Sequence, residues 1–220
     1  MRWIGVDGCR GGWIAVTIYD AGWRDFRIVE AIEELAPGAR DRVMIDIPIG
    51  LPASGRRACD LAARAMLGAA RSRVFLDARR PLLRQRSFEA ANRWGKRDGA
   101  GVSRQLWNIL PKIAALDRYV TPERQTTIRE GHPELVFARL NGGAALASKK
   151  TLAGRARRRD LVMAAGFGAI DAWLGRLRGT GAAADDLLDA CALALAAQHP
   201  RRVGGTGETD PRGLRMEIWY

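Results

Sequence analysis

The segment that most constrains the fold is Ile4–Trp13, which reads IGVDGCRGGW. The apolar residues before Asp7 are typical of a buried strand, and the glycines after it let the chain reverse within a few residues. A second apolar run, Trp13–Tyr19, predicts the returning strand. The hairpin thus places the Asp7 carboxylate at the end of a buried strand, beside backbone with little side-chain bulk. Asp7 is either an ordinary Asp-Gly turn residue or part of a site for a metal ion or a phosphate.

A second aspartate follows another predicted strand. Asp25–Glu30 predicts a third strand that completes an antiparallel meander, and a short helix follows it. Arg42–Ile47 then predicts a fourth strand, which ends around Asp46. A strand that arrives after a helix is expected to run parallel to its neighbour. If that neighbour is the first strand, Asp7 and Asp46 lie side by side at one edge of the sheet.

Residues 53–127 are predicted to form a mainly helical insertion after the fourth strand. Its helices are expected at Ala58–Leu67, Phe88–Trp94 and Ser103–Tyr119, the last with a kink or a break at Pro111. Six arginines between the first two helices form either a basic groove wall or a solvated surface: Arg71, Arg73, Arg79, Arg80, Arg84 and Arg86. Thr126–Arg129 predicts a short fifth strand.

Two later helices carry further carboxylates. Glu134 lies in the first turn of a helix predicted to end at Leu140. Ala182–His199 predicts a long helix with Asp185, Asp186 and Asp189 on the side opposite its leucines. An acidic first turn complements the helix dipole, which explains the first two aspartates better than the third. The last residues, LRMEIWY, are expected to form an edge strand.

The residue types favour a hard cation over zinc. The chain has two histidines and three scattered cysteines without a CxxC pair, so zinc ligation is not expected. A set of carboxylates instead indicates Mg²⁺ or Mn²⁺. Lys149-Lys150-Thr151 resembles the end of a phosphate-binding loop, but the second glycine of GxxxxGK[ST] is missing. No GxGxxG or GxSxG motif lies in the right context, so dinucleotide binding and serine hydrolysis are not supported.

Charge and length bound the class of protein. The 220 residues predict a single domain with an insertion. A formal net charge of +12 favours a nucleic-acid partner, although a compositional bias toward arginine would give the same balance. No apolar run approaches the ~20 residues of a membrane span, and no signal peptide is evident. We therefore expect a cytoplasmic protein without membrane contact.

Motifs along nearly the whole chain resemble the family known as domain of unknown function 429. They are GVDGCRGGW, DIPIGLP, RRACDLAAR, RSRVF, GVSRQLWNILPKI, GHPELVF, KKTLAGRARR and DDLLDA. The resemblance implies a ribonuclease-H-like α/β fold of three layers, with a mixed five-stranded sheet and helices on both faces. It also implies a metal-dependent nuclease or phosphoesterase. The implied catalytic residues are Asp7, Asp46, Glu134, Asp186 and Asp189, and all of these except Glu134 would hold the metal.

The same resemblance implies that Lys149 and Lys150 contact phosphate, and we add Arg10 to this predicted set. Two other functions stay open at the level of the sequence. The first is a non-catalytic nucleic-acid-binding protein with the same fold, and the second is a small-molecule phosphotransferase. Phosphotransferases that share this core normally need two such domains, and 220 residues cannot hold both.

Overall fold

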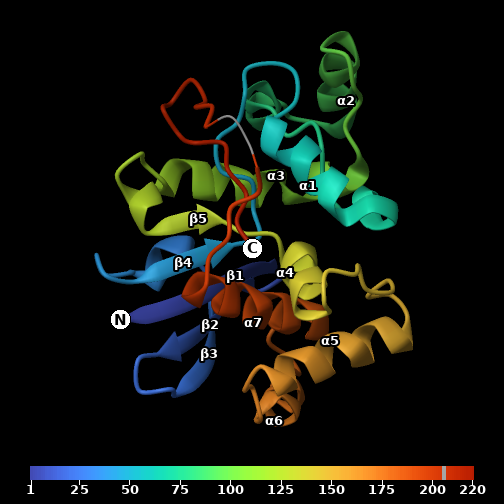
Figure 1. The fold of residues 1–220 in the computed structure, drawn as a ribbon. Coiled ribbons are helices and arrows are strands. Elements are labelled where there is room, and N and C mark those ends of the chain that lie inside the picture. The colour runs from blue at the N-terminus through green and yellow to red at the C-terminus, as the bar shows by residue number, and fades with distance from the viewer. Residues whose placement is uncertain (205–206) are drawn as a thin grey trace. The chain divides into compact units, whose positions relative to one another are not determined.

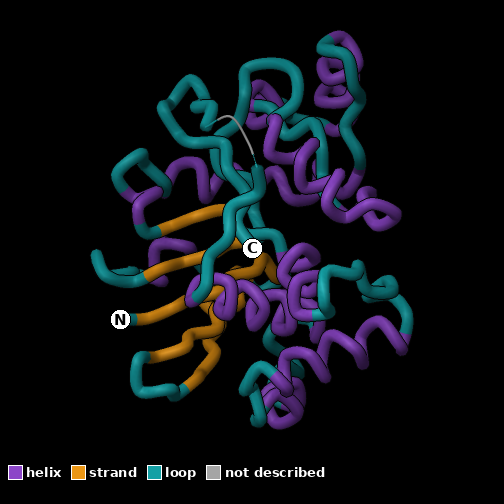
Figure 2. The backbone as a smooth tube through the Cα atoms, in the orientation of Figure 1, coloured by secondary structure: helices purple, strands orange, loops and turns teal. Residues whose placement is uncertain are grey.

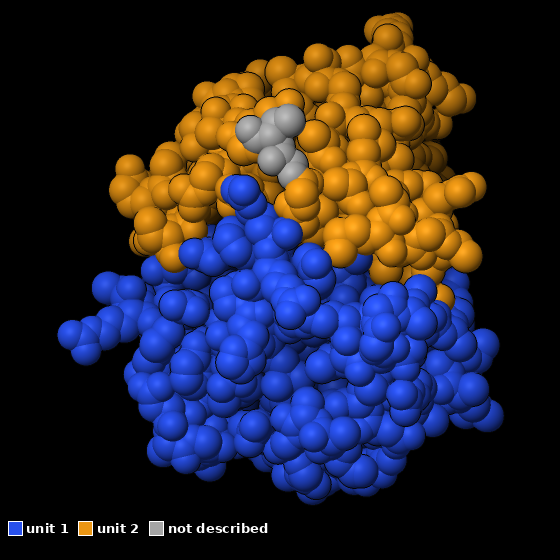
Figure 3. Space-filling view, in the orientation of Figure 1, with its two compact units in different colours: residues 1–46, 127–202, 219–220 blue, residues 47–126, 203–218 orange. Residues whose placement is uncertain are grey.

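The computed structural model describes residues 1–204 and 207–220. The chain divides into two compact units, which Figure 3 shows in different colours. Unit 1 comprises residues 1–46, 127–202 and 219–220, and unit 2 comprises residues 47–126 and 203–218. Unit 2 thus contains nearly all of the predicted helical insertion. The single-domain organisation stays a prediction.

Unit 1 is built on one mixed sheet with the strand order β3-β2-β1-β4-β5 (Figure 1). Its strands are β1 (Arg2–Cys9), β2 (Gly12–Tyr19), β3 (Arg24–Val29), β4 (Arg42–Ile45) and β5 (Ile128–Glu130). The first three strands form the predicted antiparallel meander. Strand β4 runs parallel to β1, and β5 runs parallel to β4. The predicted parallel pairing of the first and fourth strands is confirmed.

The long helix α7 (Ala184–Gln198) covers one face of this sheet, as Figures 1 and 2 show. It contacts β1, β2 and β4, and helices α4 (Pro133–Leu140) and α5 (Leu152–Ala164) pack against it. Helix α6 (Ile170–Gly175) contacts α5, while the short helix η1 (Ile32–Leu35) contacts β2 and β3. The predicted fold class is confirmed: the chain has a three-layer α/β architecture with a mixed five-stranded open sheet, consistent with the ribonuclease-H-like fold.

Strand alternation decides which side chains meet α7. Ile14, Val16 and Ile18 of β2 are all buried in the apolar core that contains α7. On β1 the residue at this face is Gly5, which pairs with Val16. A Cβ atom at Gly5 would lie 2.0 Å from the Ala190 carbonyl oxygen and 2.2 Å from the Ala194 nitrogen, both in the backbone of α7. The helix can therefore approach β1 this closely only because residue 5 has no side chain.

The predicted C-terminal edge strand is not a strand. Trp219 instead forms isolated bridges with Gly131 and Arg202. The bridge to Gly131 lies just beyond β5, where His132 caps α4 and Pro133 begins that helix. The backbone turns into the helix at this point, so a longer ladder has no partner strand.

Unit 2 consists mainly of helices at the three predicted places. They are α1 (Ala58–Leu67), α2 (Phe88–Arg97) and α3 (Arg104–Tyr119), with 3-10 turns η2 (Gly68–Arg73), η3 (Arg80–Arg84) and η4 (Arg124–Thr126). Helix α2 continues three residues beyond its predicted end at Trp94. Ser103 caps α3 as expected, accepting a hydrogen bond from the Leu106 N–H. Helix α3 is continuous through Pro111, where the sequence predicts a kink or a break. None of the described helices in either unit has the length and apolar character needed to cross a bilayer.

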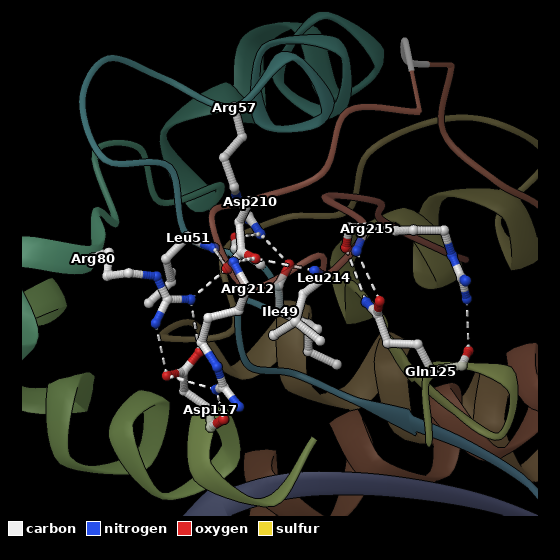
Figure 4. A network of polar contacts seen from close by, with 11 residues as sticks. Ile49, Leu51, Arg57, Arg80, Asp117, Gln125, Asp210, Arg212, Leu214 and Arg215 are labelled. Carbon is white, nitrogen blue, oxygen red and sulfur yellow. Dashed lines mark hydrogen bonds and ion pairs between the residues drawn. The ribbon is translucent and has the colours of Figure 1, made fainter. Parts of the chain in front are cut away.

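A buried polar network ties the parts of unit 2 together (Figure 4). The Asp210 carboxylate accepts hydrogen bonds from the backbone N–H groups of Leu51 and Leu214, at 2.9 and 3.0 Å. The Arg80 guanidinium lies between Asp210 and Asp117 and pairs with both. Among the six arginines predicted to form a basic surface, Arg80 therefore belongs to this network, and the buried Arg79 pairs with Asp98.

We predict that Gly5→Ala strongly destabilises the protein. The added methyl group would have to displace helix backbone, and overpacking of this kind costs about 1–3 kcal/mol or more. At this chain length the melting temperature should fall by roughly 5–10 °C. The matched control is Gly168→Ala, because Gly168 is exposed and a Cβ atom added to it would have no neighbouring atom within 4 Å. Equal melting temperatures for the two variants in differential scanning calorimetry would contradict the close packing.

Candidate metal centre

Strand register brings Asp7 and Asp46 together. Val6 pairs with Ile45, so Asp7 and Asp46 occupy the next positions on neighbouring parallel strands. The Asp46 N–H donates to the Val6 carbonyl oxygen at 3.0 Å, which continues the ladder by one bond. Asp7 lies two residues beyond Gly5, and Asp46 lies two residues beyond Met44, a residue of the core around α7. By strand alternation, both carboxylates are therefore on the α7 side of the sheet.

The third carboxylate comes from α7 itself. Asp189 immediately precedes Ala190, whose carbonyl faces Gly5, and it is only 2% exposed. Asp7, Asp46 and Asp189 each offer a carboxylate oxygen, and these three oxygens lie within 4.8 Å of one another. The structure thus gathers three of the predicted residues into one cluster, which we call the carboxylate cluster.

Mutual repulsion and burial make the ionised cluster unfavourable without a cation. Burial, followed by the charges of Asp46 and Asp189, raises the pKa of Asp7 well above its usual value. Burial and the neighbouring Asp189 charge raise the pKa of Asp46 to about 8. Burial also raises the pKa of Asp189 to about 6, although Lys149 acts in the opposite direction. A divalent cation would relieve this repulsion.

The contacts of Asp189 test whether a cation fits. Its Oδ2 accepts a hydrogen bond from the Lys149 Nζ at 2.7 Å. Its Oδ1 is buried and has no hydrogen-bond partner among the described residues. A buried carboxylate oxygen without a partner is costly, and it is a ligand atom that Mg²⁺ or Mn²⁺ prefers. The residues present therefore suit a hard divalent cation.

The two aspartates at the start of α7 differ from expectation. The sequence places both in an acidic first turn and implies Asp186 as a metal ligand, yet Asp186 provides the helix cap, since its Oδ2 accepts a hydrogen bond from the Ala183 N–H at 2.8 Å. Asp185 instead lies 3.3 Å from the Lys149 Nζ. Asp186 is still close enough for its charge to raise the pKa of Asp7, after burial and the charges of Asp46 and Asp189. Its role as a metal ligand stays a prediction.

Glu134 lies outside the carboxylate cluster. Both of its carboxylate oxygens accept hydrogen bonds from the Arg158 Nη2, at 2.7 and 2.8 Å. The fully buried Arg158 also donates to the carbonyl oxygens of Ala147 and Gly154. This ion pair joins α4 to α5 and to the segment before Lys149. The charge of Glu134 contributes to the raised pKa values of Asp46 and Asp189, and its catalytic role stays a prediction.

The three residues predicted to contact phosphate have different surroundings. Lys149 contacts the carboxylates of Asp185 and Asp189. Lys150 and Arg10 are exposed. The sequence reasoning missed Glu130, a buried residue at the end of β5 whose charge contributes to the raised pKa of Asp46. The signal was weak, because β5 has three residues and Ile128 is the one apolar residue among them.

Comparison with known families gives one match. The family model described as "Protein of unknown function (DUF429)" matches residues 5–211, which contain the whole carboxylate cluster. The chain belongs to this family. No match was found among curated proteins or among solved structures. For this DUF429 protein, the arrangement of side chains is therefore the main guide to function.

We predict that the stability of the metal-free protein falls as pH rises. Asp46 and Asp189 have native pKa values of about 8 and about 6, above the ~3.9 of an unfolded aspartate, so the native state binds more protons in that interval. The stability that protonation of these two carboxyl groups contributes is complete below about pH 4 and is lost as pH rises toward 8. In EDTA, the melting temperature should fall between pH 5 and pH 8, and saturating Mg²⁺ should flatten the profile.

The matched variants are Asp46→Asn, which should flatten the profile in EDTA, and Asp20→Asn, which should leave it unchanged. Asp20 is an exposed partner of the N-terminal amine. A profile in EDTA that rises or stays level from pH 5 to pH 8 would contradict the inferred repulsion.

Proposed function

We propose that this protein is a divalent-metal-dependent phosphodiester hydrolase, a nuclease or phosphoesterase that acts on nucleic acid. The observation that carries the proposal is the buried cluster of Asp7, Asp46 and Asp189 with its unpartnered Asp189 Oδ1. These residues would hold Mg²⁺ or Mn²⁺, with Asp186 as a proposed additional ligand. Such an ion, when bound, lowers the pKa of water and stabilises charge on a phosphoryl group.

The chain's own residues orient the ligands. The Gly8 N–H donates to the Asp7 Oδ1 at 2.7 Å and fixes that carboxylate two residues before the end of β1. Before an ion binds, Lys149 neutralises part of the charge of Asp189 through its Oδ2, and the Oδ1 of the same carboxylate has no hydrogen-bond partner among the described residues. Burial of Asp7 and Asp189 keeps water away from the ligands and strengthens their attraction for a cation.

The distribution of charge supports a polyanionic substrate. Unit 2 has 18 basic and 9 acidic residues, whereas unit 1 has 18 basic and 15 acidic residues, so most of the net charge of +12 belongs to unit 2. Arg71, Arg84 and Arg86 of unit 2 are exposed and form no ion pair with a described acidic residue. Free surface arginines are the groups that bind nucleic-acid phosphates. The three free cysteines support the proposed cytoplasmic location.

We predict that the protein hydrolyses a phosphodiester only with Mg²⁺ or Mn²⁺, and that Asp7→Asn abolishes this activity. The variant loses a ligand charge, and in EDTA its melting temperature should stay level or rise because repulsion is relieved. The assay follows bis-p-nitrophenyl phosphate together with labelled DNA and RNA, and Asp20→Asn is the control. Undiminished activity after exhaustive EDTA treatment would refute the proposal. Mn²⁺ binding without turnover on any of these substrates would favour the non-catalytic alternative.

We also predict salt-dependent binding of nucleic acid through unit 2. The logarithm of the affinity for a short DNA duplex should fall linearly with the logarithm of the salt concentration, with a slope of ~0.9 per neutralised phosphate. Charge reversal at Arg84 and Arg86 together should weaken binding about tenfold and lower the slope. The matched control reverses Arg40 and Arg178, which are exposed residues of unit 1. Fluorescence anisotropy that shows no salt dependence would indicate a small substrate instead.

A further inference from the structure

Lys149 enters the carboxylate cluster from the surface. Its Nζ lies 2.7 Å from the Asp189 Oδ2 and 3.3 Å from the Asp185 Oδ2, while its side chain remains 39% exposed. The same ammonium group also attracts Asp7 and Asp46 electrostatically. Lys149 therefore supplies positive charge at the place where three carboxylates repel one another.

The backbone around Lys149 is fixed on both sides. The Ala147 carbonyl oxygen accepts from the Arg158 Nη1 at 2.9 Å, and Arg158 is anchored by Glu134. The Ser148 carbonyl oxygen accepts from the Thr151 backbone N–H at 3.0 Å and from its Oγ1 at 2.8 Å. Conformational freedom at this position thus lies mainly in the four-carbon side chain of Lys149.

We propose that Lys149 is an internal counter-cation that competes with the divalent ion for Asp189, so that metal binding releases the Lys149 ammonium group. The inference rests on the proposed metal site. An ion held by Asp7, Asp46 and Asp189 would place two further positive charges beside the Lys149 ammonium, which already pairs with Asp189. Because the ion and the ammonium share the Asp189 carboxylate, each of them weakens the attraction of this carboxylate for the other. The released ammonium is then available for a substrate phosphate.

The first test compares Lys149→Met with Lys150→Met. Both substitutions remove one lysine charge and keep a flexible chain, but Lys150 is exposed and makes no contact with the cluster carboxylates. Isothermal titration with Mn²⁺ should show binding to Lys149→Met about tenfold tighter than to the wild type. Lys150→Met should bind within twofold of the wild type. In EDTA, only Lys149→Met should melt at a lower temperature.

The second test uses the wild-type protein and does not depend on a variant that folds. The chain has four lysines, Lys96, Lys112, Lys149 and Lys150, so reductive methylation followed by mass spectrometry reports on each of them. Saturating Mg²⁺ should accelerate methylation of Lys149 several-fold, because the ammonium leaves its carboxylate partners. Methylation of the exposed Lys96 and Lys150 should not change.

The two proposals fail in different ways. Two outcomes would overturn the proposed competition and leave the metal site standing. One is equal or weaker Mn²⁺ binding by Lys149→Met, and the other is methylation of Lys149 that does not respond to Mg²⁺ in a protein that binds the ion. The absence of Mn²⁺ binding by the wild type and by both variants overturns the metal site itself, and the competition with it.

Discussion

The approach of α7 to β1 at Gly5 is the constraint on which the site depends. A Cβ atom at residue 5 would lie 2.0 Å from the Ala190 carbonyl oxygen, so the helix backbone lies almost directly on the strand. Asp189 is the residue before Ala190, and Asp7 is two residues beyond Gly5 on the same face of β1. A side chain at residue 5 would separate the helix from the strand and thereby Asp189 from Asp7. A packing feature of the core therefore fixes the distance between two carboxylates.

That packing stabilises an arrangement that is unfavourable by itself. Burial, followed by the charges of nearby carboxylates, raises the pKa values of all three clustered aspartates. The surrounding structure offsets this cost in two ways. Lys149 supplies a charge at Asp189, and the Arg158–Glu134 ion pair fixes the segment that carries Lys149. Native proteins commonly keep such local strain where a ligand binds, because a rigid core elsewhere supplies the necessary stability.

The sequence was most informative where topology alone decides the outcome. Asp7 lies near the end of β1 and Asp46 directly follows β4, and the parallel pairing of these strands is enough to make the two aspartates neighbours. The strand predicted to end at Asp7 continues to Cys9, because Gly8 and Cys9 still pair with β2. Helical spacing grouped Asp189 with Asp185 and Asp186, and its place in the site was implied by the family resemblance. The sequence does not predict contacts that depend on the conformation of a side chain. Two examples are the cap of α7, which Asp186 provides and Asp185 does not, and the ion pair of Glu134 with Arg158. Lys149 could not be placed either, since its position follows from a loop whose path is set by contacts with residues distant in sequence.

The choice of lysine at position 149 fits a contact that has to break. Only four of the 36 basic residues are lysines, and the buried ion pairs of Arg57 with Asp60, Arg79 with Asp98 and Arg158 with Glu134 all use arginine. A guanidinium group forms several hydrogen bonds in a fixed plane and holds a carboxylate permanently, as Arg158 holds Glu134. An ammonium group is a compact charge on a flexible stem and can leave one partner for another without any movement of the backbone. Arginine is thus used where the fold needs a permanent link, and lysine stands at the carboxylates that a metal ion would share.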